Sequence, residues 1–142
     1  MNHHGADGTS AIPGGLEVTV ASPLPTAAGP EAHPAAADPE TTNPEQLLAL
    51  AWATCLNATA RAIVANTRRT SVRVEVELHE AAQGPGYEFH ADAYLSVVDA
   101  DLDETEDILR AAHARCPVSK LLHGAATVNV HAEEYATAGD SR

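Results

Sequence analysis

Alternating apolar and polar positions predict most of the strands in this chain of 142 residues. In LEVTV (16–20) apolar residues recur at every second position, which is the pattern of a half-buried β-strand. SVRVEVELHE (71–80) and GYEFHADAYLSVV (86–98) repeat the alternation on both sides of QGPG (83–86), a sequence typical of a turn. These two segments predict an antiparallel hairpin, and ATVNVHA (126–132) predicts a last strand.

Two segments carry the signals of helices. Asn43 is a good N-cap and Pro44 suits the first helical position, so we predict a helix from there to about Thr67. DLDETEDILRAAHARC (101–116) has acidic residues in its first turns, arginines near its end and apolar residues at helical spacing. This second helix is expected to end before Pro117.

The order of these elements predicts an α+β domain with one antiparallel sheet and a buried helix. We place a single domain at residues 1–134, with a Pro- and Ala-rich exposed loop at 21–42 and a flexible tail at 135–142. A chain of this length can enclose one hydrophobic core of its own.

The first predicted helix is apolar on every side. Between Leu47 and Val64 only small polar residues and Arg61 interrupt the apolar ones, which indicates a helix that is buried all round. One sheet face cannot cover such a helix, so we predict a homodimer in which a second copy covers the rest. The alternative is a monomer whose loop 21–42 covers the helix, but a Pro-rich loop buries apolar surface poorly.

Composition narrows the partners and the location. The chain has 20 acidic and 8 basic residues and a formal net charge of −12, which repels nucleic-acid phosphates and anionic membrane surfaces. No apolar run is long enough to cross a bilayer, and no signal-peptide pattern opens the sequence. We therefore expect a soluble protein in the reducing cytoplasm, with no nucleic-acid or membrane partner and no constitutive disulfide.

The two cysteines, Cys55 and Cys116, are the first candidates for chemistry. Cys55 shares a helical face with Leu48 and Trp52, where a lone cysteine is most often a small core hydrophobe. Cys116 follows a helix end, which predicts freer access. Both segments should pack in one core. Two thiols that are reversibly oxidised to a disulfide therefore explain the pair better than a metal site does. The one close His/Cys spacing, His113 to Cys116, falls short of the four ligands of structural zinc, so no metal or cofactor is expected.

Glu45 is the third candidate. On a continuous helix it lies ten residues before Cys55, which is about 15 Å along the axis and too far for direct contact. Cooperation between the two side chains would therefore need the dimer, a bend in the helix or a third group. The alternative is a first-turn glutamate that interacts only with the helix dipole.

Two motifs in order, TNPEQLLALAWATCLNA (42–58) and AAHARCPVSKLLHG (111–124), resemble the OsmC/Ohr family of organic hydroperoxide reductases. The resemblance covers roughly residues 5–132. It implies an OsmC-like intertwined homodimer, with antiparallel sheets wrapped around buried central helices. It also implies a peroxidase that reduces organic hydroperoxides, with a dithiol such as a lipoylated protein or dihydrolipoamide as its reductant.

Carried over residue by residue, the resemblance makes Cys55 the peroxidatic thiol, Cys116 the resolving thiol and Glu45 the carboxylate of the active site. The implied reaction converts Cys55 to a sulfenic acid and then to a disulfide with Cys116. Three apolar residues are expected to form walls of a substrate pocket at the dimer interface: Trp52, Leu48 and Leu121.

The resemblance is incomplete at one position. Ohr-type members carry an Arg in a GRDG-like turn that pairs with the glutamate and holds the thiolate, whereas this chain reads GADG with Ala6 in that place. Burial disfavours a thiolate, so either another cation serves or the protein is a weak peroxidase. Five residues qualify by their charge: Arg61, Arg115, Lys120, His3 and His4.

The same residues allow two other functions. A dimer that lacks the family's Arg would be a weakened enzyme that binds a small apolar ligand, or a redox sensor that acts on a partner protein. The presence of both cysteines favours the peroxidase, because a pocket that only binds does not need a second thiol.

Overall fold

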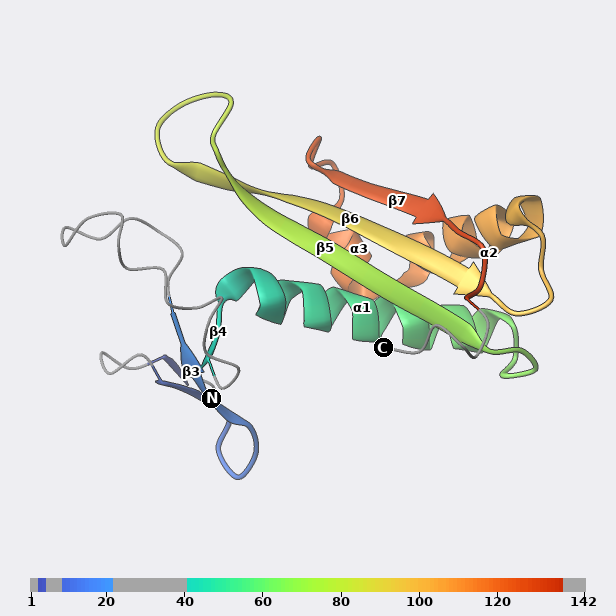
Figure 1. Cartoon of the computed structure of the whole chain (residues 1–142), viewed down its shortest axis with the longest axis horizontal. Coiled ribbons are helices and arrows are strands. Elements are labelled where there is room, and N and C mark those ends of the chain that lie inside the picture. Colours follow the sequence, from blue (N-terminus) through green and yellow to red (C-terminus); the bar gives the residue numbers. More distant parts are fainter. Residues whose placement is uncertain (1–2, 5–8, 22–40, 137–142) are drawn as a thin grey trace. The chain divides into compact units, whose positions relative to one another are not determined.

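The computed structural model describes residues 3–4, 9–21 and 41–136 (Figure 1). The chain divides into two compact units, Met1–Leu47 and Leu48–Arg142, and each unit has a sheet of its own. The single domain at 1–134 stays a prediction. The predicted loop 21–42 and tail 135–142 lie mostly outside the described residues.

The sheet of the C-terminal unit is built on the predicted hairpin. β5 (Thr70–Glu80) and β6 (Tyr87–Val97) pair antiparallel along their whole lengths, which confirms that prediction. β7 (Val128–Ala132) joins the other side of β6, so the order is β5-β6-β7. β7 runs parallel to β6, so the expectation of a purely antiparallel sheet is wrong. The helical segment between the two strands supplies the long connection that a parallel pair needs.

The alternation along these strands separates an inner face from an outer face. On the inner face Val72 and Val74 of β5 pack against the core, and Ala91, Ala93 and Leu95 of β6 are buried in it. Val128 and Val130 extend the same face onto β7. The two alanines leave room for helix side chains to fill the space at the sheet centre.

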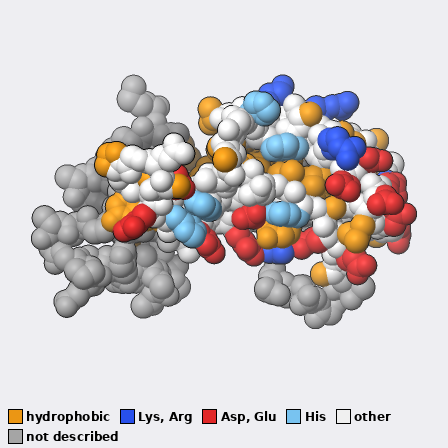
Figure 2. Space-filling model, turned by 90° about the horizontal axis from the view of Figure 1, so that it is seen from above, with side chains coloured by type: hydrophobic (Ala, Val, Ile, Leu, Met, Phe, Trp, Pro, Cys, Tyr) orange, Lys and Arg blue, Asp and Glu red, His pale blue; other side chains and the backbone are white. Residues whose placement is uncertain are grey.

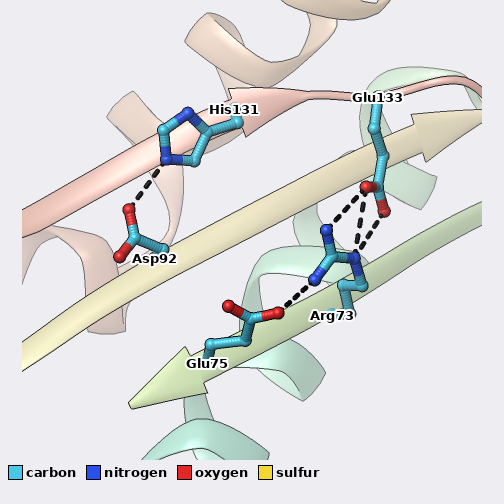
Figure 3. Close-up of polar contacts among 5 residues, drawn as sticks. All are labelled: Arg73, Glu75, Asp92, His131 and Glu133. Atoms are coloured by element: carbon cyan, nitrogen blue, oxygen red, sulfur yellow. Dashed lines mark hydrogen bonds and ion pairs between the residues drawn. The ribbon is translucent and has the colours of Figure 1, made fainter. Parts of the chain in front are cut away.

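The outer face carries exposed ion pairs (Figure 3). The Arg73 guanidinium donates to both oxygens of Glu133, with its Nη2 at 3.0 Å from Oε2, and it also pairs with Glu75. His131 Nε2 lies 2.8 Å from Asp92 Oδ1. All five side chains are at least partly open to solvent.

The central helix α1 (Pro44–Ile63) begins as predicted and ends before the expected limit near Thr67. The Asn43 Oδ1 accepts the backbone N–H of the third residue after it at 2.8 Å, which confirms the N-cap. Ala65 and Asn66 adopt positive φ angles of 52° and 56°. This left-handed backbone turns the chain away from the helix axis and ends the helix early.

One side of α1 enters the core of the C-terminal unit. Trp52, Leu56 and Ala60 are fully buried there, at the i, i+4, i+8 spacing of one helix face. Leu50, on a different side, is 62% exposed. Within the described residues one side of α1 is therefore covered, and the prediction that a second copy covers the rest stays a prediction.

Two helices follow the hairpin. α2 (Leu102–Arg115) is capped by Asp101, whose Oδ1 accepts the Glu104 N–H at 2.8 Å, and its range confirms the predicted second helix. α3 (Pro117–Leu122) was not predicted. Proline ends a helix but also suits the first turn of a new one, and here it does both.

The N-terminal unit contains a small mixed sheet in the order β1-β2-β3-β4. Its strands are short: β1 (His3–His4), β2 (Thr9–Ala11), β3 (Glu17–Val20) and β4 (Thr41–Thr42). Only β3 was predicted, and β4 lies at the end of the predicted loop. β2 and β3 are joined by a turn in which Pro13 precedes Gly14, whose φ of +71° suits the third position of a type II turn.

The predicted mixture of helix and sheet is confirmed, but the single antiparallel sheet is wrong. Two sheets are present among the described residues, and each includes one parallel pair. In the view of Figure 2, Asp and Glu side chains crowd the end of the C-terminal unit that carries α2. No helix in the described ranges is both long and apolar enough to span a membrane.

Candidate active site

The structure brings the two cysteines together from segments that are distant in the sequence. Cys55 lies on α1, and Cys116 lies at the junction of α2 and α3. The two side chains hydrogen-bond each other, and neither is in a disulfide. Two free thiols in contact are a pair that an oxidant can join as a disulfide.

The two thiols differ in their access to solvent. Cys116 is 0% exposed, whereas Cys55 is half-buried. The expected freer access of Cys116 is wrong. The α3 helix, which begins at the next residue, closes the space that a helix end followed by a loop would have left open.

Ser119 is the principal polar neighbour of Cys116. Its backbone N–H lies 3.5 Å from the Cys116 Sγ, and its hydroxyl hydrogen-bonds the same sulfur. The Trp52 Nε1–H donates to the Ser119 Oγ at 2.9 Å. Trp52 from α1 and Ser119 from α3 are both buried, so this contact ties the two helices together beside the thiols.

Burial and these contacts together determine the pKa of the Cys116 thiol. Burial is the largest single influence and raises the pKa of the thiol. The hydrogen bonds from the Ser119 backbone and hydroxyl, from Cys55 and from the Val118 backbone act in the other direction and prevail. The pKa of Cys116 is therefore below its ordinary value, which favours the thiolate.

The predicted carboxylate Glu45 lies in the first turn of α1, and Cys55 lies on the same continuous helix. At the helical rise the two residues are about 15 Å apart along the axis. The Glu45 Oε2 is buried and has no hydrogen-bond partner among the described residues. The described part of the chain thus leaves this carboxylate oxygen without the cation that the resemblance would supply.

The predicted pocket walls occupy different environments. Trp52 is fully buried beside the thiols, and Leu48 is half-buried on the same helix. Leu121 on α3 is 84% exposed, and its role as a wall of a pocket at the dimer interface stays a prediction.

The candidate cations are exposed or lie outside the described part. Arg61, Arg115 and Lys120 are exposed, and within residues 41–136 no ion pair joins them to Glu45. The structure does not describe the side chains of His3 and His4 or any part of Ala6. The same ranges contain no cluster of three or more His, Cys, Asp or Glu side chains that could hold a metal ion.

Two neighbours of the thiol site were not assigned a role from the sequence. Ser119 stands three residues after Cys116, a spacing that on a short helix returns its N–H to the sulfur. The His113 ring lies 6.5 Å from the Trp52 ring, and its buried Nδ1 has no partner in the described part. Burial first, and the nearby charge of His123 second, lower the pKa of His113.

Residues 37–131 match the family model described as OsmC-like protein, which covers more than half of the chain. A relative from Staphylococcus aureus (strain USA300), named organic hydroperoxide resistance protein-like, is 31% identical over 104 residues. That alignment covers 69% of this chain and 74% of the relative. A protein of the same name from Mycoplasma pneumoniae is 29% identical over 123 residues, which cover 83% of this chain and 80% of that protein.

Among solved structures, the organic hydroperoxide resistance protein OhrB of Bacillus subtilis superposes with a TM-score of 0.70. The superposition covers 95% of each chain at 22% sequence identity. At this identity the likeness establishes the shared fold.

Proposed function

Because the chain belongs to the OsmC-like protein family, we propose that it is a thiol-dependent peroxidase that reduces organic hydroperoxides to alcohols. The observation that carries this proposal is the contact between Cys55 and Cys116 at the junction of three helices. A protein that only bound an apolar ligand would not need two thiols in contact. The contact therefore favours redox chemistry over binding alone.

Cys55 is the nucleophile in this proposal, because it is the more accessible thiol. Its thiolate attacks one peroxide oxygen, the O–O bond breaks, and the departing alkoxide takes a proton and leaves as the alcohol. Cys55 is then a sulfenic acid. The Cys116 thiolate attacks this sulfur, hydroxide leaves and is protonated to water, and the disulfide forms.

A dithiol completes the cycle by returning two electrons and two protons to the disulfide. Dihydrolipoamide or a lipoylated protein is the reductant that the family resemblance suggests. A chemistry that needs Cys55 reduced between turnovers suits a reducing cytoplasm, which we keep as the proposed location.

Glu45 is the proposed carboxylate of the site. A second subunit or a segment outside the description would have to supply the cation that pairs with its buried Oε2. Ala6→Arg tests this idea, because it restores the residue type that the GRDG-like turn has in the family. The variant should react faster with iodoacetamide at Cys55 and reduce peroxide faster near neutral pH. Unchanged rates in both measurements would argue against the alignment of this turn.

We also propose that the active form is a homodimer. The exposed Leu50 and the exposed alanines on the outer side of α1 provide an apolar surface that a second copy would cover. Light scattering over a dilution series should report twice the mass of the 14.8 kDa chain. A monomer that persists to high concentration would contradict the dimer.

The decisive experiment compares cumene hydroperoxide with hydrogen peroxide, using dihydrolipoamide as the reductant. We expect faster loss of the organic peroxide, because an apolar site binds its hydrocarbon part. Cys55→Ser should abolish turnover, and Cys116→Ser should allow one turnover and leave a sulfenic acid on Cys55. Full activity of the Cys55→Ser protein would refute the proposal.

A further inference from the structure

The surroundings of the two sulfurs suggest how the disulfide would be reopened. A reductant thiolate must approach one sulfur in line with the S–S bond, while the other sulfur leaves with the electron pair. Cys55 is half-buried on α1, whereas Cys116 is fully enclosed at the α2–α3 junction. In the single chain, Cys55 is thus the cysteine that a reductant can reach.

The Cys116 sulfur is the one equipped to carry negative charge. The Ser119 N–H points to it at 3.5 Å, and the Ser119 hydroxyl makes a second hydrogen bond. Hydrogen bonds to an ionised sulfur are stronger than those to a neutral one. A sulfur with a stabilised thiolate is also the better leaving group in thiol–disulfide exchange.

Trp52 fixes the direction of the Ser119 hydroxyl. The indole Nε1–H is only a donor, so in its 2.9 Å contact the Ser119 oxygen must be the acceptor. The hydroxyl proton is then free to point to Cys116. Both Trp52 and Ser119 are buried, at 0% and 1% exposure, so water does not compete for these hydrogen bonds.

We infer that the dithiol reductant attacks the Cys55 sulfur of the disulfide, and that Cys116 leaves as a thiolate held by Ser119, which Trp52 positions. This inference rests on the proposed Cys55–Cys116 disulfide. The reductant thiolate forms a new S–S bond to Cys55, the old S–S bond breaks, and its electron pair goes to Cys116. The second thiol of the reductant then displaces Cys55, and the oxidised reductant leaves as a disulfide.

The lowered pKa of the Cys116 thiol agrees with this division of roles. Ser119 acts through the sulfur that it contacts, so it is a positioning residue rather than a nucleophile. Trp52 acts one step further away, through the Ser119 oxygen.

The first test locates the attacked sulfur in the unaltered protein. Diamide converts the dithiol to the disulfide, and the monothiol 2-mercaptoethanol is then added and quenched with acid at short times. Peptide mass spectrometry should find the 2-mercaptoethanol adduct on Cys55 and a free thiol on Cys116. An adduct found mainly on Cys116 would overturn the inference. Because diamide replaces peroxide, this result is independent of whether the protein is a peroxidase.

The second test measures the contribution of the hydroxyl. Ser119→Ala should slow reduction of the diamide-formed disulfide by dihydrolipoamide by about 3- to 10-fold, because the leaving thiolate loses a donor. Ser119→Thr keeps a hydroxyl and should recover most of the rate. Ser96→Ala is the matched control, since Ser96 is a buried serine of β6 that is not among the hydrogen-bond partners of Cys116.

A titration distinguishes positioning from a general loss of packing. In a Cys55→Ser background, thiolate absorbance reports Cys116 alone, and adding Ser119→Ala should move its titration to higher pH. Trp52→Phe keeps the aromatic ring but removes the donor, so it should give a smaller shift in the same direction. Unchanged titration and an unchanged reduction rate in the Ser119→Ala proteins would remove Ser119 from the mechanism.

Discussion

The two faces of the β5-β6-β7 sheet differ in what their side chains contribute. The inner face packs Ala91, Ala93 and Leu95 against α1 and α2, in the same core that contains Cys116. The outer face presents Arg73, Glu133 and other charged side chains to solvent (Figure 3). Both faces come from one alternating pattern, so neighbouring residues of one strand serve different purposes.

This difference indicates which face of the sheet stabilises the C-terminal unit and supports the two thiols. Removing apolar area from water stabilises the inner face at about 25 cal/mol per Å², and the resulting rigid core holds the two thiols in contact. Exposed ion pairs contribute roughly 0–1 kcal/mol each. The inner face should therefore be sensitive to small changes of shape, and the outer face should tolerate changes of charge.

The largest effect is expected from a cavity in the core. Leu56→Ala removes a fully buried side chain of α1 and should lower the free energy of unfolding by about 2–5 kcal/mol. Leu121→Ala makes the same chemical change at a side chain that is 84% exposed and should cost less than about 0.5 kcal/mol. Urea titration followed by the fluorescence of Trp52, the one tryptophan, measures both. If both variants lost the same free energy of unfolding, burial within one chain would not determine how much each leucine contributes to stability.

Overfilling the inner face should have an intermediate effect. Ala93 is 0% exposed and is paired with Val74 on one side and Val130 on the other. Ala93→Leu should therefore cost about 1–3 kcal/mol, because the added carbons have no free space. Asn129→Leu adds apolar bulk on the outer face of β7, where the residue is exposed, and should stay within about 0.5 kcal/mol. The contrast between faces would fail if the Asn129 variant were the less stable of the two.

A small effect is expected from the outer ion pairs. Arg73 pairs with Glu133 and lies over the Tyr94 ring, 3.7 Å from its centroid. A double-mutant cycle of Arg73→Ala and Glu133→Ala should give a coupling energy of about 0.2–1 kcal/mol that shrinks in salt. A coupling well above that range, or one insensitive to salt, would show that this face stabilises the sheet as strongly as the core does.

The sequence predicted the parts of the fold that depend on local pattern. Alternation over 71–80 and 86–98 identified β5, β6 and their inner faces, because every second residue must meet the core. The N-cap at Asn43 was visible for a similar reason, since a cap needs only its own helix. The α3 helix was missed because its six residues are too few to show a helical period.

Long-range relations could not be obtained in this way. The alternation in β7 is the same in either chain direction, so its parallel pairing with β6 had no local signal. The family resemblance named Cys55 and Cys116 as a pair, but the enclosure of Cys116 depends on α3 and on a contact from Trp52 to Ser119 across the fold. The role of Glu45 remains a proposal, because its buried Oε2 has no hydrogen-bond partner among the described residues.

The smallest predicted effect is on how the free energy of unfolding depends on pH. It comes from His113, whose ring lies 6.5 Å from that of the core residue Trp52. Burial first, and His123 second, lower the pKa of His113, so below the ordinary histidine pKa of about 6.5 the unfolded chain binds a proton more readily than the folded one. The stability that comes from keeping His113 neutral is complete above a pH of about 6.5. It is lost as the pH falls from there toward the lowered pKa of His113 in the folded protein. His113→Gln should therefore flatten the pH dependence of the unfolding free energy below about pH 6.5. His123→Gln removes only the second cause and should leave most of the slope. If the His113→Gln protein kept the full slope, the pH dependence would belong to other groups, and the buried Nδ1 would have no part in it.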